Sequence, residues 1–229
     1  IFPKGTAYTF DGTNYLALPE VSKVIISKEM DATLNFWMKT SQSGFATLLS
    51  NGKGDATDAL ESNGYRNKWA FNLTTAGRIE LQAENKKFPF GTTIVNDDSW
   101  HHIAMSLTRN GTVRMYIDGK ELGSYSSADL GGFVAGNLFV GARGTLNTVD
   151  NYYSGIMEEL CIWNMARSAD QIKADQYYEV NPESTGLLLY SPFNKPEIDN
   201  VYGPKYYYPK NAFEKESAYA LLNGKPLAF

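Results

Sequence analysis

Apolar and polar residues alternate most regularly between residues 103 and 117. Every second position is apolar in two consecutive runs, which comprise Ile103, Met105 and Leu107, then Val113, Met115 and Ile117. A repeat of two predicts strands that turn one face toward a core. The Asn110-Gly111 pair between the runs favours a tight hairpin turn because both residues tolerate positive φ. We therefore predict a β-hairpin with one buried face and one exposed face.

Similar alternation, bounded by turn residues, predicts strands along most of the chain. These strands are expected within residues 8–18, 32–40, 46–49, 69–74, 78–84, 137–141, 155–164 and 186–193. Ser168 and Gln171 have the spacing of a capping box, which predicts one short surface helix over about residues 168–175. The ranges 51–68 and 143–153 are polar and lack periodicity, so both are predicted to be loops.

Composition excludes several classes of protein and of site. The 229 residues are enough for one large domain, and the net charge of −4 gives no basic surface for nucleic acid. The single cysteine, Cys161, excludes an internal disulfide and a cysteine-based zinc site. No apolar run approaches the roughly 20 residues that span a membrane. The chain begins at Ile1 without a signal-peptide pattern, so we expect a mature or excised segment.

Several strings together resemble a known family. They are Phe10-Asp-Gly12, the strand that contains Trp37, the stretch from Trp-His-His at 100–102 to Asp-Gly-Lys at 118–120, and GIMEELCIWN at 155–164. This pattern resembles the laminin-G-like and pentraxin-like jelly rolls of the concanavalin A-like lectin/glucanase superfamily. The resemblance implies an all-β fold, an antiparallel two-sheet β-sandwich of roughly a dozen strands with one short surface helix. It covers a domain at residues 1–193. The Pro/Tyr-rich extension at 194–229 is expected to be irregular chain that packs on the sandwich or leads to a further domain.

Glu158 is the most informative charged residue. It is in phase with Leu160 and Ile162, which predicts that its side chain points toward the core. A buried carboxylate is costly unless it is paired, hydrogen-bonded or bound to a metal. In the resembled family an acidic residue here often binds a structural calcium, which makes Glu158 and, more weakly, Asp11 candidate Ca²⁺ ligands. Alternatively, Glu158 accepts from backbone N–H groups or pairs with Lys or Arg. A melting temperature that is unchanged by EDTA and by added Ca²⁺ would exclude a stabilising metal site.

Enzymatic activity is not predicted. A retaining glycosidase needs two carboxyl groups about 5–5.5 Å apart, and an inverting one needs them somewhat further apart. Adjacent Glu158 and Glu159 face opposite ways, whereas Glu80 and Glu84 are separated by about 13 Å of strand. The only histidines, His101 and His102, are expected to be structural.

The two polar loops offer aromatic, amide and charged groups of the kind that bind sugars. The candidate ligand-binding residues are Tyr65, Arg66, Trp69, Arg143, Asp150, Tyr152 and Tyr153. Our leading hypothesis is a non-catalytic, lectin-like carbohydrate-binding module with a glycan or glycoconjugate as its partner. The alternatives are a protein–protein adhesion or structural module, whose partner is another protein, and a glycoside hydrolase or lyase. The resemblance implies an extracellular, cell-surface or periplasmic location.

Overall fold

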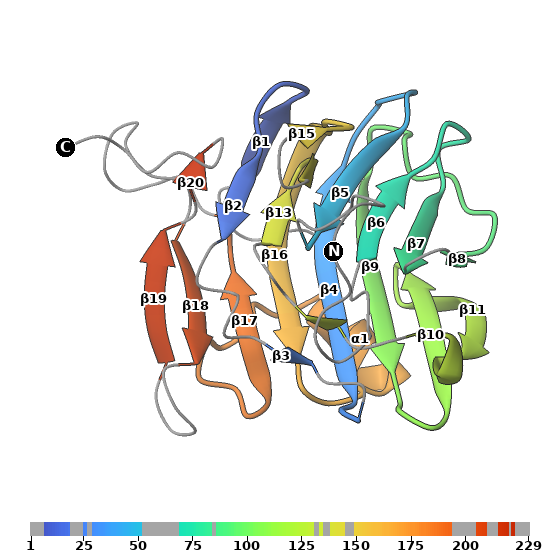
Figure 1. Cartoon of the computed structure of the whole chain (residues 1–229), viewed down its shortest axis with the longest axis vertical. Helices are drawn as coiled ribbons and strands as arrows, with labels where there is room; N and C mark the ends of the chain where they lie inside the picture. Colours follow the sequence, from blue (N-terminus) through green and yellow to red (C-terminus); the bar gives the residue numbers. More distant parts are fainter. Residues whose placement is uncertain are drawn as a thin grey trace, which may run out of the picture.

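The computed structural model describes residues 7–18, 25–26, 29–51, 69–83, 86–130, 133–134, 138–144, 149–193, 205–209, 215–219 and 221–222. The larger of its two main sheets (Figure 1) has the order β11 (Lys120–Ser126), β10 (Thr112–Ile117), β9 (Trp100–Leu107), β4 (Ala32–Lys39), β16 (Ser154–Trp163), β17 (Leu187–Ser191), β18 (Lys205–Pro209), β19 (Lys215–Tyr219). Strand β1 (Tyr8–Asp11) also pairs with β16.

The second sheet packs against the first. Its order is β20 (Leu221–Leu222), β2 (Leu16–Leu18), β13 (Leu138–Val140), β5 (Ala46–Ser50), β6 (Trp69–Leu73), β7 (Ile79–Ala83), β8 (Lys86–Pro89). Two small pairs join β3 (Ile25–Ile26) to β12 (Phe133–Val134), and β14 (Arg143–Gly144) to β15 (Val149–Asp150). The described ranges contain twenty strands, some of only two residues, one 3₁₀ turn (Ser127–Asp129) and helix α1 (Ala169–Asp175). The predicted antiparallel β-sandwich with one short helix is confirmed.

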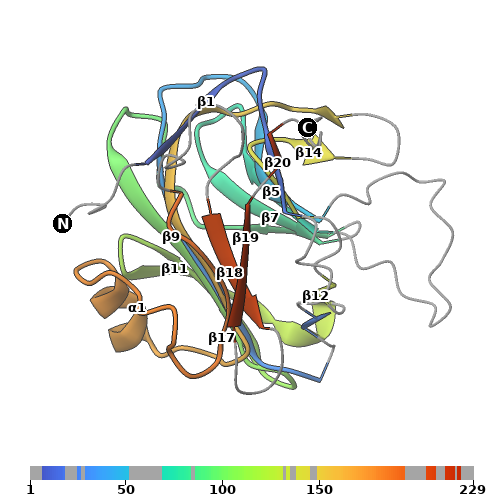
Figure 2. The same ribbon diagram turned by 90° about the vertical axis from the view of Figure 1, so that its left-hand side faces the viewer.

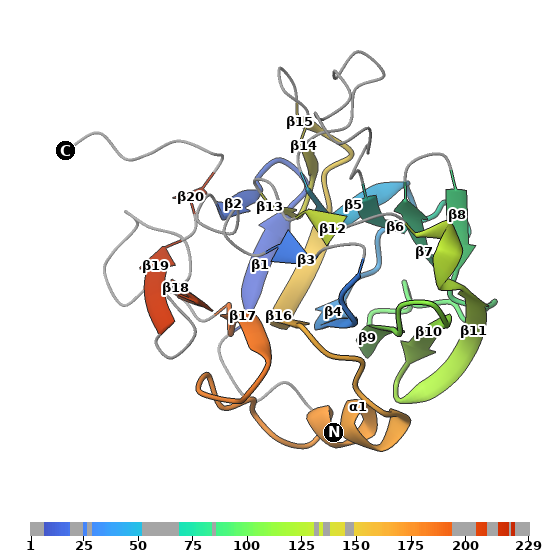
Figure 3. The same cartoon turned by 60° about the horizontal axis from the view of Figure 1, so that its bottom comes forward.

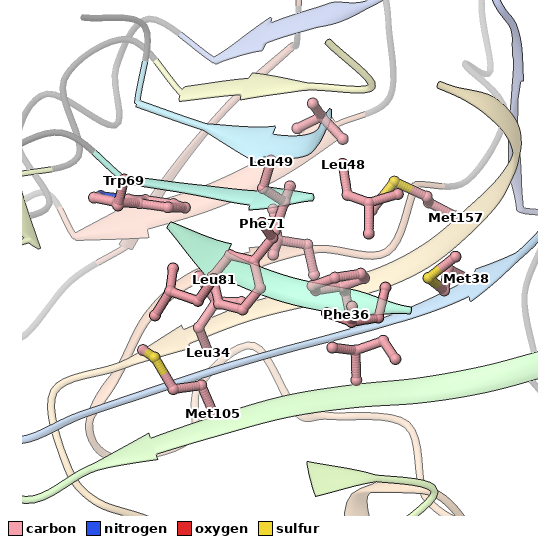
Figure 4. Close-up of a cluster of buried hydrophobic side chains, with 14 of the residues drawn as sticks. Leu34, Phe36, Met38, Leu48, Leu49, Trp69, Phe71, Leu81, Met105 and Met157 are labelled. Carbon is pink, nitrogen blue, oxygen red and sulfur yellow. The ribbon is translucent and has the colours of Figure 1, made fainter. Parts of the chain in front are cut away.

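The core lies between the two sheets (Figure 4). Phe36 on β4 and Phe71 on β6 meet edge to face, with 5.9 Å between ring centroids. All six apolar residues of the predicted hairpin are buried in this core. Burying side chains of this size contributes about 1.5–3 kcal/mol each, so the sheet-to-sheet contact is the main source of stability.

The central hairpin forms as predicted, but α1 covers part of its second face. Asn110 has a φ of 56°, as the turn requires, and Met105 pairs with Met115 across the strands. On the other face, Ala104 is fully buried with Tyr116 and Ile172. Ile172 belongs to α1, which covers this face of the nine-stranded sheet (Figure 2).

Helix α1 begins with the predicted capping box. The Ser168 hydroxyl accepts from the Gln171 backbone N–H at 3.2 Å, and the Gln171 side chain accepts from the Ser168 N–H at 2.9 Å. Arg167, just before the helix, donates two hydrogen bonds to Asp175 at its end and stacks over Trp163 at 4.1 Å. These contacts fix the helix against the outer face of β16.

A β-bulge in β16 overturns the predicted orientation of Glu158. Glu159 has a φ of 52°, and the pairing with β4 shifts register between Glu158 and Cys161. Glu158 lies opposite Trp37 on the outer face, whereas Leu160 returns to the core. The prediction that Glu158 points toward the core is wrong because one extra residue inverts the alternation. Glu158 is nevertheless only 1% exposed, since that outer face is covered.

The C-terminal extension is not irregular where it is described. Strands β18 and β19 form a hairpin, and Tyr207 of β18 stacks on Tyr190 of β17 at 6.2 Å between ring centroids. Strand β20 pairs with β2, so the extension adds strands to both sheets. The boundary at residue 193 stays a prediction. In the described part of the chain, no helix has both the length and the apolar character needed to cross a membrane.

Candidate functional site

Three aromatic side chains gather on the outer face of the seven-stranded sheet. Phe139 alternates with the core residues Leu138 and Val140, so its ring points away from the core. Tyr15 stacks on Phe139 with 5.5 Å between centroids and 26° between planes. The rings of Tyr152 and Tyr15 are 6.3 Å apart between centroids and tilted by 52°. All three residues are partly exposed, and we call Tyr15, Phe139 and Tyr152 the aromatic surface.

An ion pair borders the aromatic surface. Arg143 and Asp150 are opposite each other in the β14–β15 pair. The Arg143 Nε and Nη2 donate to the two Asp150 carboxylate oxygens at 2.8 and 2.7 Å, and each side chain is 44% exposed. Gly144 lies directly over Phe139, because a Cβ there would be 2.5 Å from three of its ring carbons. The β14–β15 pair therefore lies against the aromatic surface at Gly144.

Backbone contacts fix the segment that contains these residues. The Ser50 hydroxyl donates to the Ala142 carbonyl at 3.1 Å and accepts from the Gly144 N–H at 3.3 Å. The Thr47 N–H donates to the Asn151 carbonyl at 2.8 Å. The Gln42 amide donates to the Tyr152 carbonyl at 3.1 Å. The side chains of the site are thus presented by backbone that is tied to the sheet, which lowers the cost of ordering them for a ligand.

Tyr15 is protonated at neutral pH. Burial raises the pKa of its phenol, and the neighbouring Tyr152 adds to the increase. The group can therefore donate a hydrogen bond as well as accept one. The site faces away from α1, which lies on the opposite side of the sandwich from β14 and β15 (Figure 3). A ligand could thus reach the aromatic surface without displacing the helix.

The structure pairs two of the seven predicted ligand-binding residues, Arg143 and Asp150, and places a third, Tyr152, in the aromatic surface. It places Tyr153 in the core, fully buried, with its hydroxyl donating to the Lys39 carbonyl at 2.9 Å. Trp69 is also a core residue, 5% exposed and edge to face with Phe71 (Figure 4). The prediction that Tyr153 and Trp69 contact a surface ligand is therefore wrong, because both side chains are buried in the core. Tyr65 and Arg66 lie outside the described residues.

Sequence reasoning missed Tyr15 and Phe139. Both lie within or beside predicted strands, whereas the predicted ligand-binding residues lie mostly in the two polar loops. The alternation offered a clue, because Phe139 is out of phase with Leu138 and Val140, and Tyr15 is out of phase with Leu16. An aromatic residue on the outer face of a sheet is a candidate for contact with a ligand or another protein.

The two calcium candidates do not form one site. Asp11 pairs with Ser154 in the β1–β16 ladder, four residues along the strand from Glu158, or about 13 Å. One Asp11 carboxylate oxygen already accepts from the Thr13 N–H, the Thr13 hydroxyl and the Asn14 N–H. Among the described residues, no group of three or more His, Cys, Asp or Glu is placed to bind a metal. The geometry does not fit a calcium ion shared by Glu158 and Asp11, and calcium binding by either alone stays a prediction.

The adjacent histidines have structural partners. The His101 ring lies between two carboxylates, with Nδ1 2.8 Å from Asp118 and Nε2 3.1 Å from Asp97. His102 is fully buried beside Trp37, and its backbone N–H donates to Asp118 at 2.8 Å. These contacts link the start of β9 to the turn after β10.

Two antiparallel sheets packed face to face define a jelly-roll β-sandwich. A laminin-G family model, described as concanavalin A-like lectin/glucanases superfamily, matches residues 10–173. The chain belongs to this superfamily, which confirms the resemblance drawn from its sequence.

Individual relatives are more distant. The chain is 29% identical over 150 residues to a rat (Rattus norvegicus) protein, sushi, von Willebrand factor type A, EGF and pentraxin domain-containing protein 1. That match covers 62% of this chain and 4% of the rat protein. A Bacteroides ovatus structure, assigned as a carbohydrate-binding protein, has a TM-score of 0.68 at 17% identity over 97% of this chain and 60% of that one. The CBM40 module of the Ruminococcus gnavus IT-sialidase, bound to α2,3-sialyllactose, has a TM-score of 0.58 at 18% identity, over 74% of this chain and 95% of that one.

Proposed function

We propose that the protein is a non-catalytic carbohydrate-binding module of a secreted or cell-surface protein. The glycan would bind at the aromatic surface beside the Arg143–Asp150 pair. The observation that carries this proposal is the combination of partly exposed rings with a fixed pair of donors and acceptors. A pyranose has an apolar face of C–H groups and a rim of hydroxyls. Rings can pack against the face while the charged pair and the tyrosine hydroxyls bind the rim.

The comparisons support this proposal at the level of the fold. Relatives named as carbohydrate-binding share the two-sheet architecture, at identities too low to transfer a ligand. A non-catalytic role is supported by the same relatives, which are named for carbohydrate binding. The extracellular or cell-surface location is inferred from the same superfamily.

Replacing the exposed rings tests the proposed site. We expect Tyr15→Ala and Tyr152→Ala each to weaken binding about tenfold or more, because each removes apolar contact that a sugar face would use. Binding is measured by titration calorimetry with a glycan selected on a broad array. Tyr178→Ala is the matched control, since Tyr178 is 70% exposed but lies beyond α1 on the other side of the molecule.

The outcomes separate the alternatives. Saturable binding that is lost in the Tyr15 and Tyr152 variants and kept in the Tyr178 variant supports the proposal. Glycan binding that survives both substitutions would place the site elsewhere. No binding across the array would refute the carbohydrate reading and favour the alternative of a protein adhesion module.

A further inference from the structure

The Arg143 guanidinium does not present an isolated positive charge. Two of its nitrogens are bound to the two oxygens of Asp150 in a bidentate arrangement. Residues 143 and 150 are cross-strand partners, so the short β14–β15 ladder holds the two side chains in register. The pair is electrically neutral, and its carboxylate is as exposed to solvent as its guanidinium.

This geometry disfavours anionic ligands. A carboxylate or sulfate that approached Arg143 would compete with Asp150 for the edge that a bidentate acid uses. Asp150 is tethered across the ladder and has the advantage of an intramolecular partner. An anion that did not displace it would instead lie close to a like charge, which is repulsive.

A neutral sugar neither competes with Asp150 for Arg143 nor is repelled by the Asp150 charge. Each carboxylate oxygen can accept more than one hydrogen bond, so Asp150 can accept from a sugar hydroxyl while it remains bound to Arg143. The apolar face of the same sugar would then pack against the aromatic surface, whose Phe139 lies against Gly144, the neighbour of Arg143.

Building on the proposed function, we infer that the site takes neutral pyranose units in preference to sugars that carry a carboxylate or sulfate. Asp150 determines this preference in two ways. It accepts the hydroxyl hydrogen bond, and it neutralises Arg143.

The decisive experiment compares Asp150→Asn with the unmodified protein on two ligand panels. The neutral panel contains lactose, cellotriose and xylotriose, and the anionic panel contains 3′-sialyllactose, trigalacturonate and a heparin tetrasaccharide. We expect the unmodified protein to bind at least one neutral sugar about tenfold or more tightly than any anionic one. Asp150→Asn keeps the side-chain shape, and we expect it to lose about tenfold on the neutral sugar and to gain measurable, salt-sensitive binding of anionic ones.

Controls keep the result interpretable. Asp170→Asn removes an exposed carboxylate on α1, away from the site, and is expected to change neither panel. Asp150→Glu retains the charge and should keep the preference for neutral sugars. Tighter binding of an anionic sugar by the unmodified protein would overturn the inference while leaving carbohydrate binding intact. If the protein binds no sugar of either panel and none on the broad array, the proposed function is overturned, and this inference with it.

Discussion

At the scale of single residues, the two histidines at the start of β9 respond to pH in opposite ways. The hydrogen bond to Asp118 raises the pKa of His101 despite the opposing effect of burial, and Asp97 adds to the increase. Burial lowers the pKa of His102 to about 4. The charged form is therefore favoured by folding at His101 and disfavoured at His102.

The sign of each contribution follows from linkage. The stabilisation from His101 is fully present below the unfolded-state pKa of about 6.5 and is lost as pH rises through the higher folded value. The contribution of His102 is present above about 6.5 and is lost as pH falls toward about 4. Together the histidines favour the folded state most near pH 6.5.

Urea unfolding between pH 5 and 9 measures this effect. We expect His101→Gln to lower the unfolding free energy more at pH 6 than at pH 9, because only the imidazolium has two carboxylate partners to lose. An equal loss at both pH values would show that the ring acts through packing alone. Asp98→Asn is a suitable control, since Asp98 is nearby and its side chain is 69% exposed.

The neighbouring residues Tyr152 and Tyr153 show that the burial of a side chain cannot be predicted from its residue type alone. Tyr152 and Tyr153 are both in a polar stretch, and the sequence gives no reason to separate them. Tyr152 lies beside Tyr15 on the surface, whereas Tyr153 is buried with its hydroxyl 2.9 Å from the Lys39 carbonyl. The difference depends on a partner more than a hundred positions away, which no local pattern contains.

At the scale of elements, features encoded within a few residues were predictable. The turn at Asn110-Gly111 and the capping box of α1 are local. The capping box forms as expected, and the chain turns at the expected place, although only Asn110 of the pair has a positive φ. The bulge at Glu159 was not predictable, because no residue type in the strand marks it. The extra residue nevertheless inverts the alternation of buried and exposed positions around it. The burial of His102 and Ala104 on the outer face was also not predicted, since it depends on where α1 packs against the sheet.

The capping box offers a test of the helix. Ser168→Ala removes the hydroxyl that accepts from the Gln171 N–H, and we expect it to lower the unfolding free energy by about 1 kcal/mol. Gln171→Ala removes only the reciprocal hydrogen bond and should cost less. Chemical denaturation at pH 7 measures both. A Ser168→Ala variant as stable as the parent would mean that packing of Ile172 alone fixes the helix.

At the scale of the whole molecule, the two outer faces of the sandwich have different roles. The face of the nine-stranded sheet is covered by α1 and buries His102 and Glu158. The face of the seven-stranded sheet carries the aromatic surface, and the β14–β15 pair with Arg143 and Asp150 lies on the side of the sandwich away from the helix (Figure 3). We therefore expect one face to contribute to stability and the other to bind the ligand.

The central claim is that a glycan binds on that second face, and amide chemical-shift mapping tests it most directly. The protein is titrated with the tightest neutral glycan from the array while backbone amide signals are followed. We predict that the largest shifts cluster at Tyr15, Phe139, Arg143, Asp150 and Tyr152, and that amides of α1 are unaffected. Shifts that cluster on α1 and the outer face of β4, with the aromatic surface unchanged, would contradict the account.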